Sequence, residues 1–133
     1  VSSINWFNDN KDKMVKGEGY IIMNAKEEVI STVIGTLASI ISNSKDLSDS
    51  TYIVAMARNP DIDKTKVSLR VSRRSNDKVD LRLLVQEIAD KVEGVESGGH
   101  MNAAGAVIPT EKEEEFIAVA KEVLEKKCME ETI

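Results

Sequence analysis

Residues 97–106 are the segment of the sequence best suited to binding a ligand, because small residues there surround the only histidine of the chain. Two adjacent glycines, Gly98 and Gly99, allow backbone amides to converge on one spot with no side chain to block an anion. His100 can donate a hydrogen bond to a phosphate oxygen or carry charge near neutral pH. An isolated Gly-Gly-His is more often a tight turn, but the Ala-Ala-Gly run after it and the serine-arginine strand before it favour a ligand site. We therefore predict a phosphate-binding loop over residues 97–102, with Asn102 included.

A second set of candidate residues is cationic. The five arginines of the chain all fall within one window: Arg58, Arg70, Arg73, Arg74 and Arg82. Within this window Ser68, Arg70 and Ser72 alternate with apolar residues, so they share the polar face of a half-buried strand. Arg70 can offer a charge-assisted fork to a phosphate. Arg73 and Arg74 are neighbours on that strand and point to opposite faces, so at most one of them lines the site.

The remaining composition favours a binding module over a catalytic centre. Two-metal phosphodiester hydrolysis needs several carboxylates and histidines around ions about 4 Å apart. The chain has one histidine, and an acidic run such as Glu113–Glu115 is typical of a solvated helix start. We therefore predict no catalytic residue, no metal ligand and no cofactor within this chain.

Charge and cysteine content restrict partners and location. The formal net charge of −5 argues against strong non-specific nucleic-acid binding, which usually relies on excess lysine and arginine. No apolar run approaches the ~18 residues of a membrane span, so no membrane contact is expected. The single cysteine, Cys128, cannot form an internal disulfide, which predicts a reducing, cytoplasmic location.

Periodicity places these candidates on secondary structure. Buried strands are expected at Tyr20–Met23 and Thr51–Arg58, a half-buried strand at Lys66–Arg73 and a short strand at Ala103–Ile108. A helix should begin at Asn24, with Glu27 completing a capping box, and carry its apolar face to Ile41. Asp80 should cap a second helix that ends at Gly94, and Thr110 with Glu113 should cap a third.

The expected element order indicates one α/β domain. It predicts a mixed β-sheet of about four to five strands flanked by helices, because two of the strands are joined too closely for a crossover helix. Residues 1–16 are expected to be an irregular or helical lead-in from a longer parent protein, and residues 17–133 to form the domain. Gly35, Ser39 and Ser42 form a small-residue stripe on the first helix, where tight packing is the favoured explanation over a ligand.

These motifs resemble the DHHA1 domain, the C-terminal domain of DHH-type phosphoesterases. The family signature is a Gly-Gly-Gly-His segment followed a few residues later by Ala-Ala-Gly, with an upstream Ser-x-Arg-Ser strand. Gly98–His100 and Ala103–Gly105 match the glycine segment, and Ser68–Ser72 matches the strand approximately. Ser97 replaces the first glycine of the signature, and Val71 separates the arginine from the second serine.

The resemblance extends from about Tyr20 to Ile108, because Asn24-Ala25 and Ile34–Ile41 look like the corresponding segments of archaeal RecJ-like exonucleases. It implies a DHHA1-like fold and a two-domain parent enzyme. The N-terminal DHH domain of that parent would bind manganese or another divalent metal and activate water. The DHHA1 domain would close over the cleft and grip the phosphates of single-stranded DNA or RNA.

Several alternatives stay open at this point. The chain could serve an enzyme that degrades short oligonucleotides or nucleotides, act as a protein-interaction domain with replication proteins as partners, or bind transfer RNA as related domains of alanyl-tRNA synthetases do. Base stacking would favour long single strands. The few aromatic residues of the chain offer little support for it.

Overall fold

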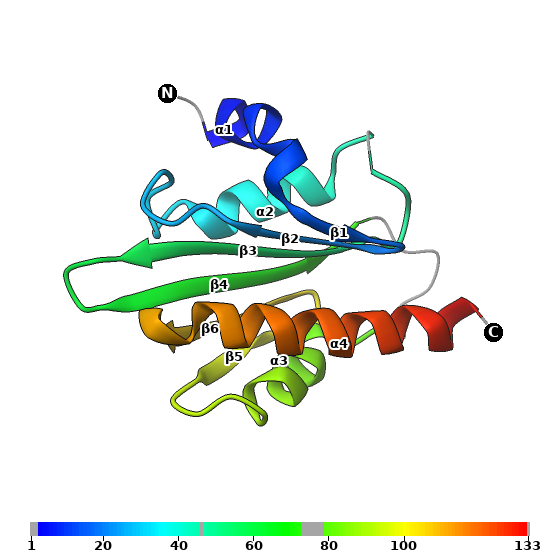
Figure 1. Ribbon diagram of the computed structural model, residues 1–133. Helices are drawn as coiled ribbons and strands as arrows, with labels where there is room; N and C mark the ends of the chain where they lie inside the picture. Colours follow the sequence, from blue (N-terminus) through cyan, green and yellow to red (C-terminus); the bar gives the residue numbers. More distant parts are fainter. Residues whose placement is uncertain (1–2, 46, 73–78, 133) are drawn as a thin grey trace.

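The computed structural model describes residues 3–45, 47–72 and 79–132, and it has a six-stranded sheet with helices on both faces (Figure 1). The strands are β1 (Val15–Gly17), β2 (Tyr20–Asn24), β3 (Tyr52–Asn59), β4 (Lys64–Val71), β5 (Glu96–His100) and β6 (Ala103–Pro109). The helices are α1 (Ser3–Asp9), α2 (Ile34–Ser42), α3 (Leu81–Ala89) and α4 (Glu113–Thr132), with 3₁₀ turns η1 (Lys11–Lys13) and η2 (Thr110–Lys112). The predicted single α/β domain is confirmed, with six strands where four to five were expected.

The sheet is mixed, with strand order β1-β2-β3-β4-β6-β5. Among the described strands, β2 and β3 are the one parallel pair, and α2 lies in the connection between them, as a parallel crossover requires. The other four pairings are antiparallel, and β3–β4 and β5–β6 are hairpins. The close spacing of the strands around residue 60 therefore predicted the mixed character correctly.

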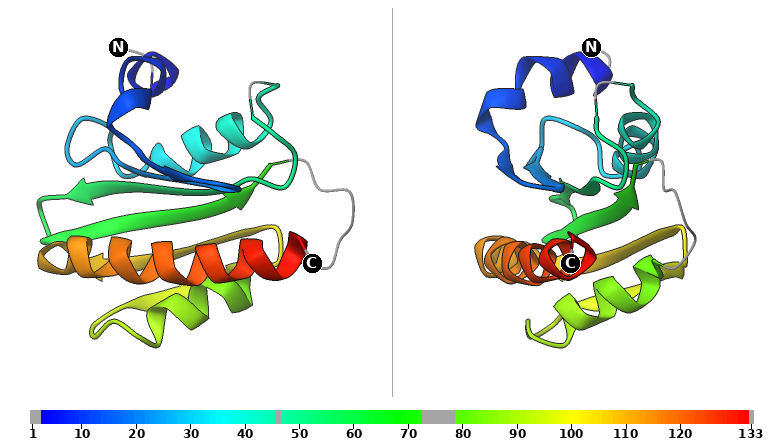
Figure 2. Two further views of the ribbon diagram at one scale, coloured as in Figure 1. Left: turned by 45° about the vertical axis from the view of Figure 1, so that its right-hand side comes forward. Right: turned by 90° about the vertical axis from the view of Figure 1, so that its right-hand side faces the viewer.

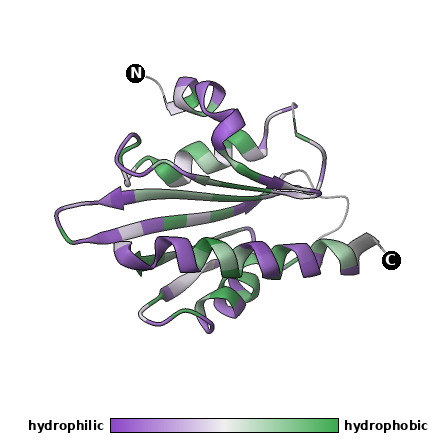
Figure 3. Ribbon diagram, in the orientation of Figure 1, coloured by the Kyte–Doolittle hydropathy of each residue, from purple (hydrophilic) through white to green (hydrophobic). Residues whose placement is uncertain are grey.

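Helices lie on both faces of the sheet (Figure 2), and each face carries its own hydrophobic core. In β3, Tyr52, Val54 and Met56 pack on the α3 and α4 face, whereas Ile53 and Ala55 pack on the α1 and α2 face. All of these side chains are almost completely buried, as predicted for a central strand covered on both sides. Figure 3 shows hydrophobic segments both along the strands and on the helices that pack against them.

The helix expected from Asn24 begins ten residues later, at Ile34. The side-chain carbonyl of Asn24 accepts a hydrogen bond from the Lys26 amide (3.0 Å), which is an Asx turn in place of a helix cap. Lys26 has a φ of 52°, and its carbonyl accepts from the Arg58 amide (2.8 Å). The segment after β2 thus stays bonded to β3 before the chain turns into α2.

The two other predicted caps differ in outcome. Asp80 caps α3 as expected, because its carboxylate accepts from the amides of Arg82 and Leu83. Gly94 has the left-handed φ of 83° expected of a terminating glycine, although regular α-helix ends earlier, at Ala89. The Thr110 capping box is wrong: a 3₁₀ turn starts there, and the Glu113 side chain points into a buried polar cluster.

Candidate functional site

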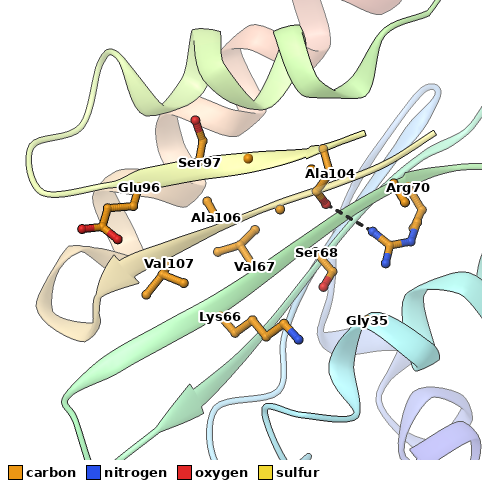
Figure 4. Close-up of a pocket in the computed structure, with 14 residues that line it drawn as sticks. Gly35, Lys66, Val67, Ser68, Arg70, Glu96, Ser97, Ala104, Ala106 and Val107 are labelled. Atoms are coloured by element: carbon orange, nitrogen blue, oxygen red, sulfur yellow. Dashed lines mark hydrogen bonds between the residues drawn. The ribbon is translucent and has the colours of Figure 1, made fainter. Parts of the chain in front are cut away.

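A groove lies on the α2 face of the sheet, over β4, β6 and β5 (Figure 4). Its volume is about 430 Å³, within the range of small-ligand pockets. The helix α3 covers the opposite face of β5 and β6, and α2 packs on β3 and β4 on the groove side. The groove therefore lies beside α2, over the part of this face that none of the described helices covers.

The strand register arranges the groove in rows across the three strands. The middle row contains Ser68, Gly105 and Gly98, which are paired across β4, β6 and β5. A row on one side contains Lys66 on β4 and Glu96 on β5, with Val107 between them. Arg70 lies two residues beyond Ser68, at the other end of the groove (Figure 4). The floor is consequently almost bare, with charged groups at its ends.

The glycines of this segment have different structural roles. A β-carbon on Gly99 would lie 2.6 Å from the Ala103 carbonyl oxygen, and the φ of this residue is 118°, a conformation that favours glycine. A β-carbon on Gly105 would lie 2.6 Å from the Val67 carbonyl oxygen. By contrast, a β-carbon on Gly98 would meet no atom within 4 Å, and its φ lies outside the left-handed region. Folding requires glycine at the first two positions, whereas at Gly98 the missing side chain leaves space in the groove.

Arg70 supplies the charge at one end of the groove. Its Nε donates to the Ser39 hydroxyl (3.0 Å), and its Nη1 donates to the carbonyls of Leu69 (3.0 Å) and Ala104 (3.2 Å). These acceptors are neutral, and no carboxylate in the described part of the chain forms an ion pair with Arg70. Burial lowers the pKa of Arg70, yet a guanidinium stays protonated at neutral pH. The result is a half-buried cation whose charge no anion among the described residues compensates.

The helix α2 positions this cation. Gly35, in the first turn, lies so close that a β-carbon there would be 3.4 Å from Arg70 Nη2 and 3.3 Å from Ser68 Oγ. Ser39, one turn later, fixes the guanidinium through Nε. Gly35 and Ser39, which belong to the small-residue stripe predicted from the sequence, therefore lie next to the groove. Their helical spacing was the sequence signal that could have placed both of them near the site. Packing is an equally good reason for glycine at position 35, because the absence of a side chain at Gly35 permits the close approach of β4.

The predicted phosphate loop is instead an edge strand and a turn. Residues 96–100 form β5, and Met101 and Asn102 form the turn into β6. Pairing with β6 organises the glycines, so the segment is a sheet edge and not a free loop. His100 ends β5 and is exposed, but neither it nor Asn102 lines the groove. Of the predicted site residues, the groove brings together Gly98, Gly99, Ser68 and Arg70.

Ser72 lies apart from the groove. It is fully buried, and its hydroxyl donates to the Ser48 carbonyl (2.6 Å) and accepts from the Thr51 amide (2.7 Å). These bonds give it a structural role beside the start of β3. Arg73 and Arg74 lie outside the described residues.

The groove also contains charged residues that the sequence analysis did not select. Lys66 lies two residues before Ser68, so continuing the same strand alternation would have identified it. Glu96 precedes the glycine segment directly and is exposed at the groove end opposite Arg70 (Figure 4). Its place in the groove depends on β5 being a strand, which the sequence did not indicate.

Two of the other arginines are bound to carboxylates. Arg58 forms a bidentate pair with Glu113, with bonds of 2.9 and 2.8 Å. Asn24 and Thr65 also donate to Glu113, which is 4% exposed and so is not the solvated residue expected. Burial acts to raise the pKa of Glu113, but hydrogen bonds from Arg58, Thr65 and Asn24 outweigh it and hold the pKa below its usual value. Arg82 pairs with Asp80 on the surface.

Within the described residues, no group of three or more His, Cys, Asp or Glu side chains lies close enough together to hold a metal ion. No helix within the same ranges has the length and apolar character needed to cross a bilayer.

Comparisons with known proteins agree with this architecture. The sequence profile of one family, described as the DHHA1 domain, matches residues 17–126. No curated protein matches the sequence.

Three solved structures share the fold at low sequence identity. The C-Ala domain of Aquifex aeolicus alanyl-tRNA synthetase has a TM-score of 0.64 and 20% identity, over 84% of this chain and 96% of that domain. The pGpG-specific phosphodiesterase PggH from Vibrio cholerae has a TM-score of 0.56 and 10% identity, over 90% of this chain and 38% of its own. A DHH-domain structure of a member of the s1p family of ribosomal proteins has a TM-score of 0.52 and 19% identity, over 91% and 32%. The chain thus spans about a third of the length of each of the last two.

Proposed function

The chain belongs to the DHHA1 domain family, and from this we propose that its groove binds phosphate groups of a nucleotide or of single-stranded nucleic acid. The observation that carries the proposal is Arg70, a half-buried guanidinium that lacks an anionic partner within the described residues and lies beside an open glycine floor. Burying a cation without a compensating charge is costly, so a bound anion would stabilise this arrangement. A phosphate there would accept charge-assisted hydrogen bonds from the guanidinium.

In this proposal the other predicted residues assist Arg70. The bare surface at Gly98 lets a ligand approach the sheet closely, and Ser68 offers a hydroxyl in the same row. Lys66 adds a second positive charge along the groove. His100, at the end of β5, and Asn102, in the turn that follows, would contact the part of a ligand that extends beyond the groove. Ser72 is left out because its hydroxyl is occupied within the fold.

We further propose that the chain is the substrate-binding part of a RecJ-like phosphoesterase. The divalent metal, manganese or a similar ion, would belong to a DHH domain elsewhere in the parent protein, and that domain would be a partner of this one. The phosphodiesterase PggH supports the proposal, because a chain region similar in fold to this one forms part of it. No catalytic step is assigned to residues of this chain, because the described residues present no ligand set for the ion.

A second candidate function is binding of transfer RNA. It is favoured by the C-Ala domain of the alanyl-tRNA synthetase, which this chain matches over almost the entire length of that domain. The groove argues for a smaller ligand than a folded RNA, because its volume of about 430 Å³ is that of a small-ligand pocket. Competition between a transfer RNA and a 5′-phosphorylated tetranucleotide for the purified chain would distinguish the two functions.

The proposal is tested by titrating the chain with a fluorescent 5′-phosphorylated tetranucleotide. Arg70→Ala should weaken binding by about tenfold to a hundredfold, since a hydrogen bond to a charged group contributes ~1.5–3 kcal/mol. Arg82→Ala removes an equal charge from the surface and should leave affinity nearly unchanged, because that arginine is paired with Asp80. Equal effects of the two substitutions would show that binding is non-specific attraction and would refute the proposed site.

A further inference from the structure

The charges of the groove are arranged asymmetrically along its length. Arg70 lies at one end, and Glu96 lies at the other, in the row of Lys66 and Val107 (Figure 4). Lys66 and Arg70 are four residues apart on one strand, which corresponds to about 13 Å. Glu96 is two strands away from Lys66, or about 9.5 Å across the sheet. A ligand that lies along the groove therefore contacts Arg70 at one end, and at the other end it lies between Glu96 on β5 and Lys66 on the α2 side.

The carboxylate of Glu96 is available to a ligand. The structure records no hydrogen bond or ion pair for it within the described residues, although Lys66 occupies the same row. Lys66 extends towards the α2 side of the groove, whereas Glu96 extends outward from β5 (Figure 4). Because the two side chains are not paired, Lys66 does not neutralise Glu96. An ionised carboxylate accepts hydrogen bonds and repels a second anion.

We infer that Glu96 is a specificity-determining residue that selects a nucleotide end carrying a free sugar hydroxyl. The inference rests on the proposed phosphate-binding function of the same groove. With one phosphate at Arg70, the far end of the ligand lies beside Glu96. A terminal hydroxyl there donates to the carboxylate, whereas a phosphate there meets like charge. An internal stretch of a strand carries phosphates at both ends of the groove, so the groove takes a chain terminus or a short oligonucleotide.

Two matched ligands test this inference on the whole chain. Both are dithymidine dinucleotides with a 5′-phosphate; one ends in a 3′-hydroxyl and the other in a 3′-phosphate. Binding is followed by NMR titration, which measures weak affinities. The 3′-hydroxyl ligand should bind about tenfold more tightly, the size expected for one hydrogen bond to a charged group and the loss of one repulsion. The 3′-phosphate ligand cannot avoid the repulsion by binding in the reverse direction, because one of its two terminal phosphates then still lies beside Glu96.

Variants assign the preference to Glu96. Glu96→Gln removes the charge at nearly constant shape and should reduce the preference to about twofold or less, mainly by improving binding of the 3′-phosphate ligand. Glu122→Gln changes the net charge equally on α4, at an exposed position on the opposite face, and should keep the tenfold preference.

The outcomes separate this inference from the proposed function. Equal affinity of the two ligands, with both lost in Arg70→Ala, overturns the role of Glu96 and keeps the phosphate site. A preference that survives Glu96→Gln likewise overturns it. Absence of binding by both ligands, or binding that Arg70→Ala leaves intact, overturns the proposed function and this inference together.

Discussion

Replacing Gly98 with alanine tests whether this glycine is needed for ligand binding or for folding. The added methyl group meets no atom within 4 Å, and the backbone φ there lies outside the left-handed region. Glycine in a strand is ~0.5–1 kcal/mol less favourable than alanine, because it loses more conformational freedom on folding. Gly98→Ala should therefore raise the free energy of unfolding by about 0.5 kcal/mol, or the melting temperature by roughly 1–3 °C.

The same methyl group should impair ligand binding. It projects from the middle row of the groove, where Gly105 and Ser68 provide the only other surface of that row. Overpacking by one carbon costs ~1–3 kcal/mol in a close contact, which corresponds to a loss of affinity of about fivefold to a hundredfold. The prediction is thus a protein that is slightly more stable and binds its ligand less well.

Gly105→Ala is the matched control. Its β-carbon would lie 2.6 Å from the Val67 carbonyl oxygen, so the strands must separate and the domain should lose ~1–3 kcal/mol. The assays are thermal unfolding and titration with the fluorescent tetranucleotide, and affinity is calculated per folded molecule. Destabilisation by Gly98→Ala, or unchanged affinity in a stable variant, would refute the reasoning about the groove floor.

Three further substitutions give distinct results. His100→Ala should change stability by only about ±0.5 kcal/mol, because the residue is exposed, yet weaken single-strand affinity by roughly tenfold; thermal unfolding and titration measure both, and unchanged affinity removes His100 from the site. Ser39→Ala should weaken affinity by about two- to tenfold through the loss of its bond to Arg70, and Ser39→Thr should restore affinity, which a purely structural loss would not predict. Glu113 has a folded-state pKa below its usual value, so the stability it contributes is present at neutral pH and is lost as pH falls through that folded pKa. Melting temperatures measured from pH 7 downward should therefore fall more steeply in the parent protein than in Glu113→Gln. At pH 7 the variant should be less stable than the parent, because Arg58 loses its charged partner. Parallel profiles of melting temperature against pH would contradict this role of Glu113.

Local sequence patterns determined the regular core of the fold. Strands such as Tyr52–Asn59 combine β-compatible residues with burial on both faces, and this property is visible in the sequence. The alternation at Ser68 and Arg70 placed both on one face, which is the groove face. Asp80 was recognisable as a cap because its bonds reach only two and three residues along the chain. Each of these features depends on neighbours within one or two turns.

Long-range contacts decided the features that local patterns misplaced. Asn24 and Glu113 both have the spacing of capping boxes, but they bond to each other across 89 residues, and Arg58 and Thr65 complete the cluster. A buried carboxylate needs such partners, and the tertiary structure supplies stronger ones than a helix terminus could.

The glycine segment shows the same division. Its composition predicts a ligand-binding surface at Gly98, Gly99 and the following residues, because only glycine leaves a backbone so open. Its form as the edge strand β5 depended on pairing with β6, which in turn pairs with β4. That pairing brings Glu96 and Lys66 into one row and leaves Arg70 at the far end. The sequence indicated Ser68, Arg70 and Gly98 as candidate anion-binding residues, whereas the strand register determined their order along the groove and added Lys66, because hydrogen bonds between distant segments set that register.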